Sequence, residues 1–367
     1  MTSIEELIVD DLPLLSLMMQ DAAGQSGIYA AGPYWAEKSR IAAKQIEEYG
    51  LENFRGSSNA IGISYAGAAD WDIRLQLPYG LRAGALKSLL SKKAYLGGLL
   101  TNYVSLWFDS QVSQTESIWR ASLELKNHYL SRDAVVTDLL ARYSLSDTIR
   151  GGCLDFITIN GSSISYRYLE LLLRHDYLSK NVDFSLYNSY FEIGGGFGAY
   201  VHILVDNHPN LKKIIYLDIP PNLYVGTQYL KSLFSESVRD YRSTRMDEKI
   251  TFADNDALEI LCIAPWQIER LDVSVDIFHN GNSFVEMPVD AVSNYVHHVE
   301  RLLSKVRSVV ALVSYDQHDP STTFSPAKLP EFFKREFEPF EHATLAPNRH
   351  DHHYVSLSHA DADAPEH

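Results

Sequence analysis

One stretch just past the middle of the chain decides the fold: Glu192-Ile193-Gly194-Gly195-Gly196-Phe197-Gly198. The apolar residues 189–193 predict a strand that leads into this turn, and the periodicity of residues 199–208 predicts a helix directly after it. Glycines allow the backbone to turn sharply and to approach a ligand closely. The amino terminus of the following helix faces the same place, which in a doubly wound sheet is the expected cofactor crevice.

Beyond this turn, short apolar runs alternate with helical patterns, which indicates βαβ units and a parallel sheet. After residues 189–193, strands are predicted at residues 213–218, 250–253, 273–279 and 308–314, and an antiparallel pair at 340–345 and 353–358. Helices are predicted at residues 222–234 and 289–303. The sequence therefore predicts an α/β, Rossmann-like fold, with a mostly parallel, seven-stranded sheet and helices on both faces.

The first 150 residues have helical patterns instead. Residues 34–49 place apolar side chains on one side and charged side chains on the other, and further helical patterns occupy residues 84–106, 117–129 and 133–143. After this region, another helix is predicted at residues 162–178. We expect a helical N-terminal region over residues 1–150 that covers an acceptor pocket, because pockets form where such parts meet. A Rossmann-like domain is expected over residues 151–358, followed by a disordered tail over residues 359–367.

The charge and composition of the chain exclude several classes of function. The formal net charge of −15 repels phosphate backbones, so nucleic acid is not expected as a partner. No run of about 18 uncharged apolar residues occurs, so no membrane span is expected. The start of the chain lacks the basic region of a signal peptide, and the two cysteines, Cys153 and Cys262, suit buried thiols in a reducing compartment. We therefore expect a cytoplasmic protein, and the sequence leaves a homo-oligomer open.

The glycine-rich turn fits two kinds of cofactor. Gly194, Gly196 and Ala199 satisfy the dinucleotide pattern, and Asp218 ends the next predicted strand, where a carboxylate accepts hydrogen bonds from ribose hydroxyls. Two features favour S-adenosylmethionine over NAD. Glu192 precedes the first glycine by two positions, where an acid can engage the amino-acid end of that cofactor, and the turn lies mid-chain with further strands after it. An NAD-dependent oxidoreductase and a turn without a cofactor remain as alternatives.

Three blocks of residues stand out: Phe191-Glu192-Ile193-Gly194-Gly195-Gly196-Phe197-Gly198, Tyr216-Leu217-Asp218-Ile219-Pro220-Pro221-Asn222-Leu223 and Asn282-Ser283-Phe284-Val285-Glu286-Met287. With Tyr34-Trp35 and Gly50-Leu51-x-Asn53-Phe54-Arg55, they resemble a family of sugar O-methyltransferases from gene clusters for natural products and surface polysaccharides. The resemblance implies a class I methyltransferase fold, S-adenosylmethionine as methyl donor, and a small-molecule or glycan acceptor with a sugar hydroxyl. A non-sugar hydroxyl or amine of a natural product, and a binding role without catalysis, stay open.

Methyl transfer to a sugar hydroxyl requires a general base or a metal, because the hydroxyl is a weak acid. His279 ends the fourth predicted strand and is the candidate base, since histidine titrates near neutrality; a local hydrogen bond at the strand end is the alternative. Glu286, three residues after Ser283, either caps the following helix or orients the acceptor hydroxyl. We therefore assign His279 and Glu286 to the catalytic site, and Ser283, Tyr34 and Trp35 to the acceptor.

The candidate cofactor contacts follow the ends of the predicted strands. In class I methyltransferases an acid after the third strand commonly contacts the adenine amino group, and Asp254, Asn255 and Asp256 follow that strand here; a turn or a helix cap is the alternative. The predicted cofactor-binding residues are Glu192, Gly194, Gly195, Gly196, Gly198, Asp218, Ile219, Asp254, Asn255 and Asn280.

Histidines gather at two places that merit consideration as metal ligands. His350, His352 and His353 surround Asp351, a spacing that suits a divalent metal, and His297-His298 lie together on a predicted helix. Surface or structural histidines are the favoured interpretation of both groups. Magnesium prefers oxygen ligands, so an activity that depends on magnesium would require acidic side chains to bind the ion. The nearest acidic candidates, which show no ligand spacing, are Asp276, Asp316 and Asp319. No metal site is assigned, and magnesium dependence stays open.

Overall fold

The computed structural model of the chain describes residues 8–25, 27–52, 54–55, 131–153, 156–159, 161–316, 323–343 and 350–359. The helices predicted at residues 84–106 and 117–129, and the tail from residue 360 onward, lie outside these described residues. Two predicted N-terminal helices are confirmed as α2 (Pro33–Tyr49) and α5 (Asp133–Arg142). Among the helices so described, none is long and apolar enough to cross a bilayer.

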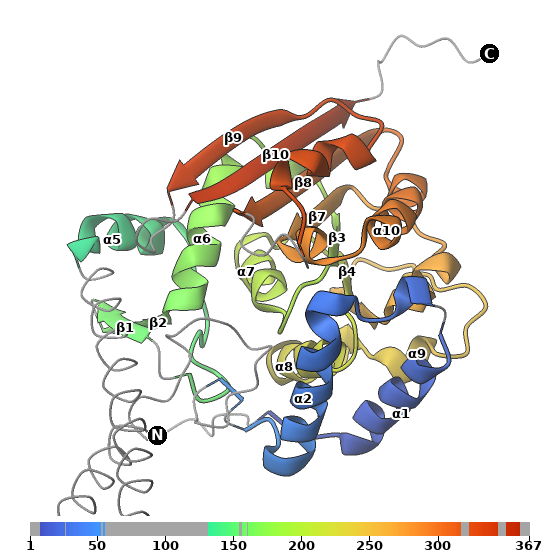
Figure 1. Cartoon of the computed structure of the whole chain (residues 1–367). Coiled ribbons are helices and arrows are strands. Elements are labelled where there is room, and N and C mark those ends of the chain that lie inside the picture. Colours follow the sequence, from blue (N-terminus) through green and yellow to red (C-terminus); the bar gives the residue numbers. More distant parts are fainter. Residues whose placement is uncertain are drawn as a thin grey trace, which may run out of the picture.

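An eight-stranded sheet forms the centre of the molecule (Figure 1). Its strand order is β5 (Val238–Arg239), β6 (Glu259–Ile263), β4 (Lys213–Leu217), β3 (Ser189–Ile193), β7 (Ile277–Gly281), β8 (Arg307–Tyr315), β10 (His350–His359) and β9 (Glu338–Ala343). Neighbouring strands from β5 to β8 are parallel, whereas β10 is antiparallel to both β8 and β9. The predicted Rossmann-like, mostly parallel sheet with a terminal antiparallel pair is confirmed. It has eight strands rather than seven because β5 is too short to give a sequence pattern.

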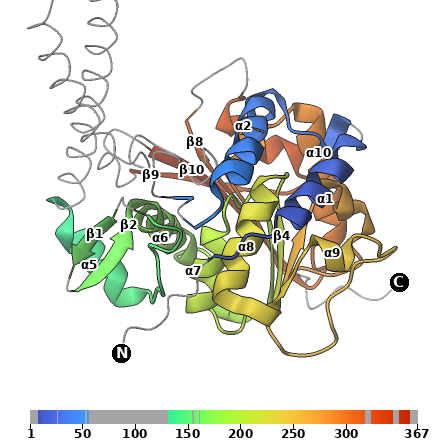
Figure 2. The ribbon, with the colours of Figure 1, turned by 90° about the horizontal axis from the view of Figure 1, so that it is seen from below.

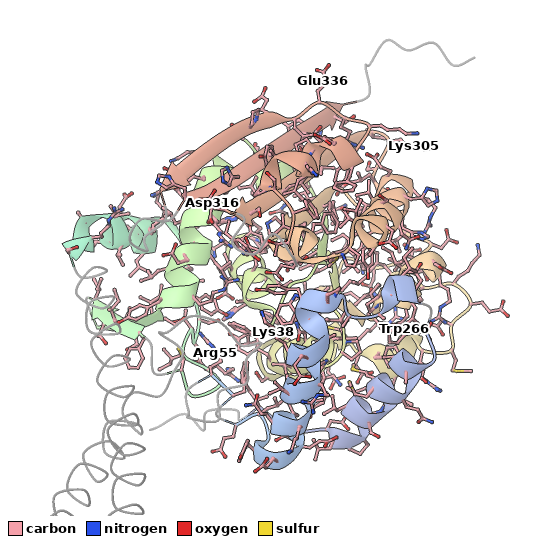
Figure 3. All side chains as sticks on the ribbon, in the orientation of Figure 1. Lys38, Arg55, Trp266, Lys305, Asp316 and Glu336 are labelled. Carbon is pink, nitrogen blue, oxygen red and sulfur yellow. The ribbon has the colours of Figure 1, made fainter. Side chains whose placement is uncertain are left out.

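Helices cover both faces of this sheet, as predicted (Figure 2). Successive residues of a strand face opposite ways. Tyr190 of β3 packs into one core with α6 (Tyr166–Ser179), α7 (Ala199–Asn207) and α8 (Asn222–Phe234). Phe191 packs into a second core with α10 (Val289–Leu302). Side chains fill the space between these layers (Figure 3), and the burial of both faces explains the nearly continuous apolar strands.

The first helix of the chain packs against α8 and α9 (Tyr241–Thr244). α1 (Leu12–Ala23) contributes Leu14 to the first core, and the hydroxyl of Tyr224 accepts a hydrogen bond from the backbone N–H of Asp11 (2.7 Å). Asp21 forms an ion pair with Arg245 just after α9 (2.5 Å). These contacts fix the segment between α1 and α2, which includes the 3-10 turn η1 (Gly27–Tyr29).

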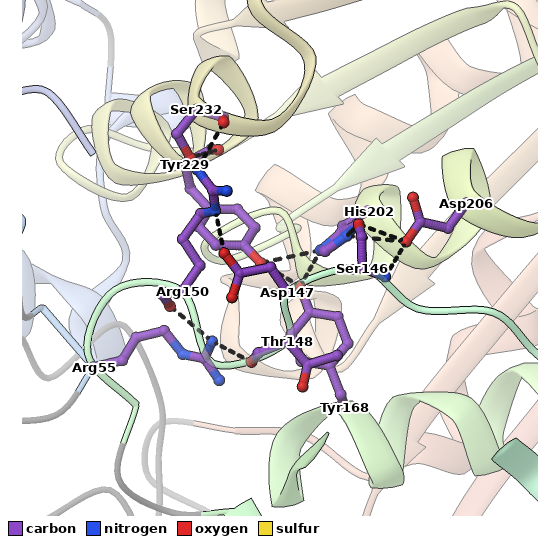
Figure 4. Close-up of polar contacts among 10 residues, drawn as sticks. All are labelled: Arg55, Ser146, Asp147, Thr148, Arg150, Tyr168, His202, Asp206, Tyr229 and Ser232. Carbon is purple, nitrogen blue, oxygen red and sulfur yellow. Dashed lines mark hydrogen bonds and ion pairs between the residues drawn. The ribbon is translucent and has the colours of Figure 1, made fainter. Parts of the chain in front are cut away.

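A buried polar network joins the chain after α2 to the turn at residues 148–150 (Figure 4). Arg55 is only 2% exposed and donates to the carbonyl of Thr148 (2.9 Å). Beside it, the hydroxyl of Tyr168 lies 2.6 Å from His202 Nδ1 and 2.5 Å from the hydroxyl of Tyr229. Arg55, which contributed to the family resemblance, therefore has a structural role.

Two strand predictions are wrong in position. Residues 250–253 form no strand: Ile250 makes one isolated bridge with Leu271, and the residues from 253 to 257 are exposed. The third parallel strand is β6, which lies buried between β4 and β5. Residues 273–276 likewise precede β7, which runs from Ile277 to Gly281.

The helix predicted over residues 162–178 begins later than expected. Its first four residues form β2 (Ser162–Ser165), which pairs antiparallel with β1 (Phe156–Ile159). α6 begins at Tyr166 because the hydroxyl of Ser165 caps it, accepting from the N–H of Tyr168 (3.4 Å).

Candidate active site

A pocket opens at the carboxyl ends of β3, β4, β7 and β8, where the glycine-rich turn leaves the sheet. Its walls also include the segment from Ile28 to Gly32, Trp35 of α2, and one face of α6. The pocket encloses about 1280 Å³ when the open solvent at its mouth is included.

The glycines of the turn allow close packing and leave space for a ligand. A Cβ added at Gly194, where φ is +77°, would lie 2.1 Å from Ser283 Oγ, and one at Gly195 would lie 2.7 Å from Glu192 Oε2. A Cβ at Gly196 would meet no atom within 4 Å. All three glycines line the pocket, so these predicted cofactor contacts are brought together. Gly198 does not line it and serves as the N-cap of α7.

Asp218 follows β4 and faces the glycine-rich turn. Its Oδ2 accepts a hydrogen bond from the N–H of Gly196 (2.8 Å), and its Oδ1 accepts one from the N–H of Ile219 (2.7 Å). Burial raises the pKa of Asp218 to about 7, although these two hydrogen bonds oppose the shift. Asp218 and Ile219 both line the pocket, as predicted.

Glu192 lies beneath the turn and is 3% exposed. Its Oε1 contacts His279, whereas its Oε2 has no hydrogen-bond partner within the described ranges. Asn222, at the start of α8, also lines the pocket, and its Oδ1 likewise lacks a donor among the described residues. A buried acceptor without a donor costs about 1–3 kcal/mol. The pocket therefore favours a ligand that brings hydrogen-bond donors to both atoms.

His279 of β7 lies beside Glu192 and faces the pocket. Its Nδ1 is 3.1 Å from Glu192 Oε1 and 2.9 Å from the hydroxyl of Tyr190, and its ring packs against Tyr200 with centroids 4.5 Å apart. Its Nε2 makes no hydrogen bond to any described residue. A carboxylate that holds Nδ1–H leaves Nε2 able to accept a proton, which is the arrangement of a general base.

Glu286, in the 3-10 turn η6 (Ser283–Glu286), is held by two aromatic donors. Trp35 Nε1 donates to its Oε2 (2.7 Å), and the hydroxyl of Tyr315 donates to its Oε1. Burial raises the pKa of Glu286, and these two hydrogen bonds oppose the shift. All three residues line the pocket. Tyr34 does not line it, and its ring packs edge-on against Trp35.

Three predicted cofactor contacts lie away from the pocket. Asp254 and Asn255 precede β6 rather than follow it, so they are at the amino ends of the strands, where Asn255 Oδ1 accepts from Lys213 Nζ (3.2 Å). Asn280 uses its amide internally: it donates to the carbonyl of Ile193 (2.9 Å) and to Ser283 Oγ (2.7 Å). Ser283 lines the pocket, and Asn280 holds it in place.

Sequence reasoning missed several residues of the pocket. Asn222 stood within the distinctive Asp-Ile-Pro-Pro-Asn-Leu block, which was the available signal. Arg167, Leu171 and Arg174 form one face of α6 and resembled an ordinary amphipathic pattern. Ile28, Ala291 and Tyr295 also line the pocket and gave no signal of their own.

The candidate metal groups are dispersed. Asp351 forms a buried ion pair with Arg174 (2.5 Å), and His352 Nε2 contacts Asp316. Asp276 accepts hydrogen bonds from the backbone before β3. Within the described ranges, no group of three or more His, Cys, Asp or Glu side chains is arranged to hold a metal ion. Asp319 lies outside those ranges.

Comparisons with known proteins give distant likenesses. No protein-family model matches the chain, and no curated protein matches it. Among solved structures, it is similar to the mitomycin 7-O-methyltransferase MmcR, with 15% identity, 48% of this chain and 51% of that chain covered, and a TM-score of 0.33.

Two further structures are similar to the same extent. The pyocyanin biosynthetic protein PhzM is 11% identical over 52% of this chain and 55% of its own, with a TM-score of 0.36. Human N-acetylserotonin methyltransferase in complex with SAM is 10% identical over 50% and 52%, with a TM-score of 0.33. The chain thus spans about half the length of these structures. Likenesses at this level do not identify an activity.

Proposed function

We propose that this chain is a methyltransferase that binds S-adenosylmethionine along its glycine-rich turn. The observation that carries the proposal is the pair of buried acceptors, Glu192 Oε2 and Asn222 Oδ1, which belong to two residues that line one pocket and have no donor in the described part of the chain. S-adenosylmethionine offers an ammonium group and two ribose hydroxyls, all of which donate hydrogen bonds. These donors suit the unsatisfied acceptors.

The charges around the turn favour this cofactor over a dinucleotide. Glu192 and Asp218 place two carboxyl groups beside the turn, and Asp218 accepts the N–H of Gly196, a donor that a pyrophosphate would need. A pyrophosphate is negatively charged and would be repelled there, whereas S-adenosylmethionine is positively charged at its ammonium and sulfonium groups.

Each part of the cofactor has a suitable partner in the pocket. Glu192 Oε2 would accept from the ammonium group, and Asp218 with Asn222 would accept from the ribose hydroxyls. Ile219 also lines the pocket and would contact the adenine. The residues that would complete an apolar wall for the adenine are Ile28, Ala291 and Tyr295.

His279 is placed to act as the general base. When bound, S-adenosylmethionine supplies an electrophilic methyl group on its sulfonium. His279 Nε2 would accept the proton of the acceptor hydroxyl, which makes that oxygen nucleophilic. Glu192 Oε1 would stabilise the resulting imidazolium through its contact with Nδ1.

We further propose that the acceptor is a hydroxyl of a sugar in a natural product or surface polysaccharide. Glu286 is a buried carboxylate whose neighbours in the pocket are the aromatic residues Trp35 and Tyr315. Carboxylates accept hydrogen bonds from sugar hydroxyls, and aromatic faces pack against sugar C–H surfaces. The family resemblance points the same way, and the N-terminal region would cover this acceptor through Trp35.

Thermal denaturation with added ligands tests the proposed cofactor. S-adenosylhomocysteine should raise the melting temperature, because a ligand that binds only the folded state stabilises it, and NAD should not. Asp218→Asn should reduce the stabilisation by S-adenosylhomocysteine. Stabilisation by NAD alone would instead identify a dinucleotide-binding protein.

A further inference from the structure

The two oxygens of the Glu192 carboxylate face different surroundings. Oε1 lies 3.1 Å from His279 Nδ1, whereas Oε2 has no hydrogen-bond partner among the described residues. Glu192 is 3% exposed and His279 is 5% exposed, so water screens their interaction poorly. A buried carboxylate is costly unless a positive group is paired with it. Within the described ranges, His279 is the basic side chain that contacts Glu192.

We propose that Glu192 couples cofactor binding to the protonation of His279, an inference that rests on the proposed function. In the empty pocket, a protonated His279 is the counterion of Glu192. Once Glu192 Oε2 accepts the ammonium group of the cofactor, a second positive charge neutralises the same carboxylate, and His279 releases its proton to solvent. His279 is then a neutral base, with Nδ1–H on Glu192 and Nε2 open toward the pocket.

The aromatic and histidine neighbours of His279 stay neutral throughout. Tyr190 of β3 lies 2.9 Å from Nδ1, and Tyr200 of α7 packs against the ring. Burial raises the pKa of both hydroxyls well above the usual range. His175 of α6 is hydrogen-bonded to Tyr200, and burial lowers the pKa of His175 to about 3. None of the three changes its charge when the cofactor binds.

The effects of other charged groups of the pocket can be distinguished from that of His279. Arg174 of α6 is paired with Asp351. Glu286 is hydrogen-bonded to Trp35 and Tyr315 rather than to His279. Asp218 is the group that a test must distinguish, because burial raises its pKa to about 7 and the ribose would contact it.

The coupling gives the catalytic cycle an order. With the cofactor bound first, His279 is already neutral when the acceptor arrives. In the transfer, the acceptor O–H bond breaks and the oxygen bonds to the methyl carbon, while the carbon–sulfur bond breaks and leaves its electron pair on sulfur. The proton moves to His279 Nε2, so the positive charge passes from sulfonium to imidazolium. That imidazolium again competes with the ammonium for Glu192, which favours release of the product cofactor.

Calorimetric titration with S-adenosylhomocysteine measures the coupling without turnover, since this probe has the ammonium group but no methyl group to transfer. Titrations at one pH in buffers of different ionisation enthalpy give the number of protons released. We expect release approaching about one proton per site in the range where histidine titrates, so affinity rises by up to about tenfold per pH unit.

Matched ligands and variants identify the source of the proton. 5′-Methylthioadenosine retains the ribose but lacks the ammonium group, so it should bind without this release, whereas a proton from Asp218 would appear with both ligands. His279→Asn keeps a donor toward Glu192 and should bind S-adenosylhomocysteine without proton release. Glu192→Gln should also abolish the release. His297→Asn changes an exposed histidine of α10 and should leave the release unchanged.

The outcomes separate this inference from the proposed function. Equal proton release with both ligands, undiminished release in His279→Asn, or tight binding of S-adenosylhomocysteine by the wild-type protein with no release would each overturn the coupling. Failure of the wild-type protein to bind S-adenosylhomocysteine would overturn the proposed function instead.

Discussion

Glu192 and His279 are direct partners in the parallel pairing of β3 with β7, and Glu192 Oε1 lies 3.1 Å from His279 Nδ1. The register of two strands thus sets the distance between the acid that precedes the glycine-rich turn and the candidate base. Because both residues are buried in strands rather than in loops, this geometry is rigid. In the proposed function, the cofactor site and the reacting end of the pocket would share this one carboxylate.

The proposed role of His279 as base predicts a selective loss of turnover. His279→Asn should lower kcat by roughly 100- to 10,000-fold, the usual contribution of general base catalysis. At a pH above the range where histidine titrates, its affinity for S-adenosylhomocysteine should stay close to that of the wild-type protein. Single-turnover methyl transfer measures the first quantity and equilibrium titration the second. His297→Asn serves as the control, and unchanged turnover in His279→Asn would remove this residue from the mechanism.

Two glycines of the turn should respond differently to the same substitution. Gly194→Ala places a Cβ 2.1 Å from Ser283 Oγ at φ +77°, so the free energy of unfolding should fall by more than about 2 kcal/mol. Gly196→Ala meets no atom within 4 Å, so only the backbone strain of about 1–3 kcal/mol applies, while its Cβ enters cofactor space. Urea denaturation should give a lower free energy of unfolding for Gly194→Ala than for Gly196→Ala. Both variants should bind S-adenosylhomocysteine weakly. Equal stability of the two variants would contradict the packing described for Ser283.

The buried carboxyl of Asp218 predicts a pH dependence of stability. Burial raises its pKa from 3.8 to about 7, so between these values the folded state binds more protons than the unfolded state. The contribution of Asp218 to stability is therefore present below about pH 4 and is lost as pH rises toward 7. Asp218→Asn removes this dependence, so its melting temperature relative to wild type should be higher at pH 8 than at pH 4.5. A difference that is constant across this range would show that folding does not raise the pKa of Asp218.

We predict that a substitution at Trp35 weakens binding of the acceptor and leaves binding of the cofactor unchanged. Trp35→Phe removes the 2.7 Å hydrogen bond to Glu286 Oε2, and a hydrogen bond to a charged group is worth about 1.5–3 kcal/mol. The KM for the acceptor should rise about tenfold or more, and affinity for S-adenosylhomocysteine should not change. Trp266→Phe, in η5 (Pro265–Arg270) and outside the pocket, is the matched control (Figure 3). A loss of cofactor affinity in Trp35→Phe would place this residue at the cofactor end instead.

The parts of the fold that were predictable have strong local patterns. Strand β3, the glycine-rich turn and α7 are adjacent in sequence. The strand and the helix each have their own hydrophobic periodicity, and the glycines indicate the turn between them. Strand β6 was missed because the isolated apolar residue Ile250 was taken as the strand start, and only pairing with β4 and β5 distinguishes the two. Asp254 and Asn255 were consequently assigned to the wrong edge of the sheet.

Residues of the site were predictable where the residue type and its place along the sequence indicate a function. They were not predictable where residues far apart in the sequence contact each other only in the folded chain. Glu192, Asp218 and His279 lie in or just after the carboxyl-terminal halves of β3, β4 and β7, so their convergence follows from a parallel sheet. The contact of Trp35 with Glu286 joins residues 251 positions apart and has no local signature. Asn280 lies near the carboxyl end of its strand, where ligand-binding residues are expected. However, both the nitrogen and the oxygen of its side-chain amide form hydrogen bonds within the protein.

A crystal structure of the protein with S-adenosylhomocysteine tests the central claim most directly. We predict the ammonium group within hydrogen-bond distance of Glu192 Oε2, the ribose hydroxyls on Asp218, and the sulfur facing the side of the pocket where His279 Nε2 is open. A cofactor bound away from the glycine-rich turn, or an ammonium group that leaves Glu192 Oε2 without a partner, would contradict the account.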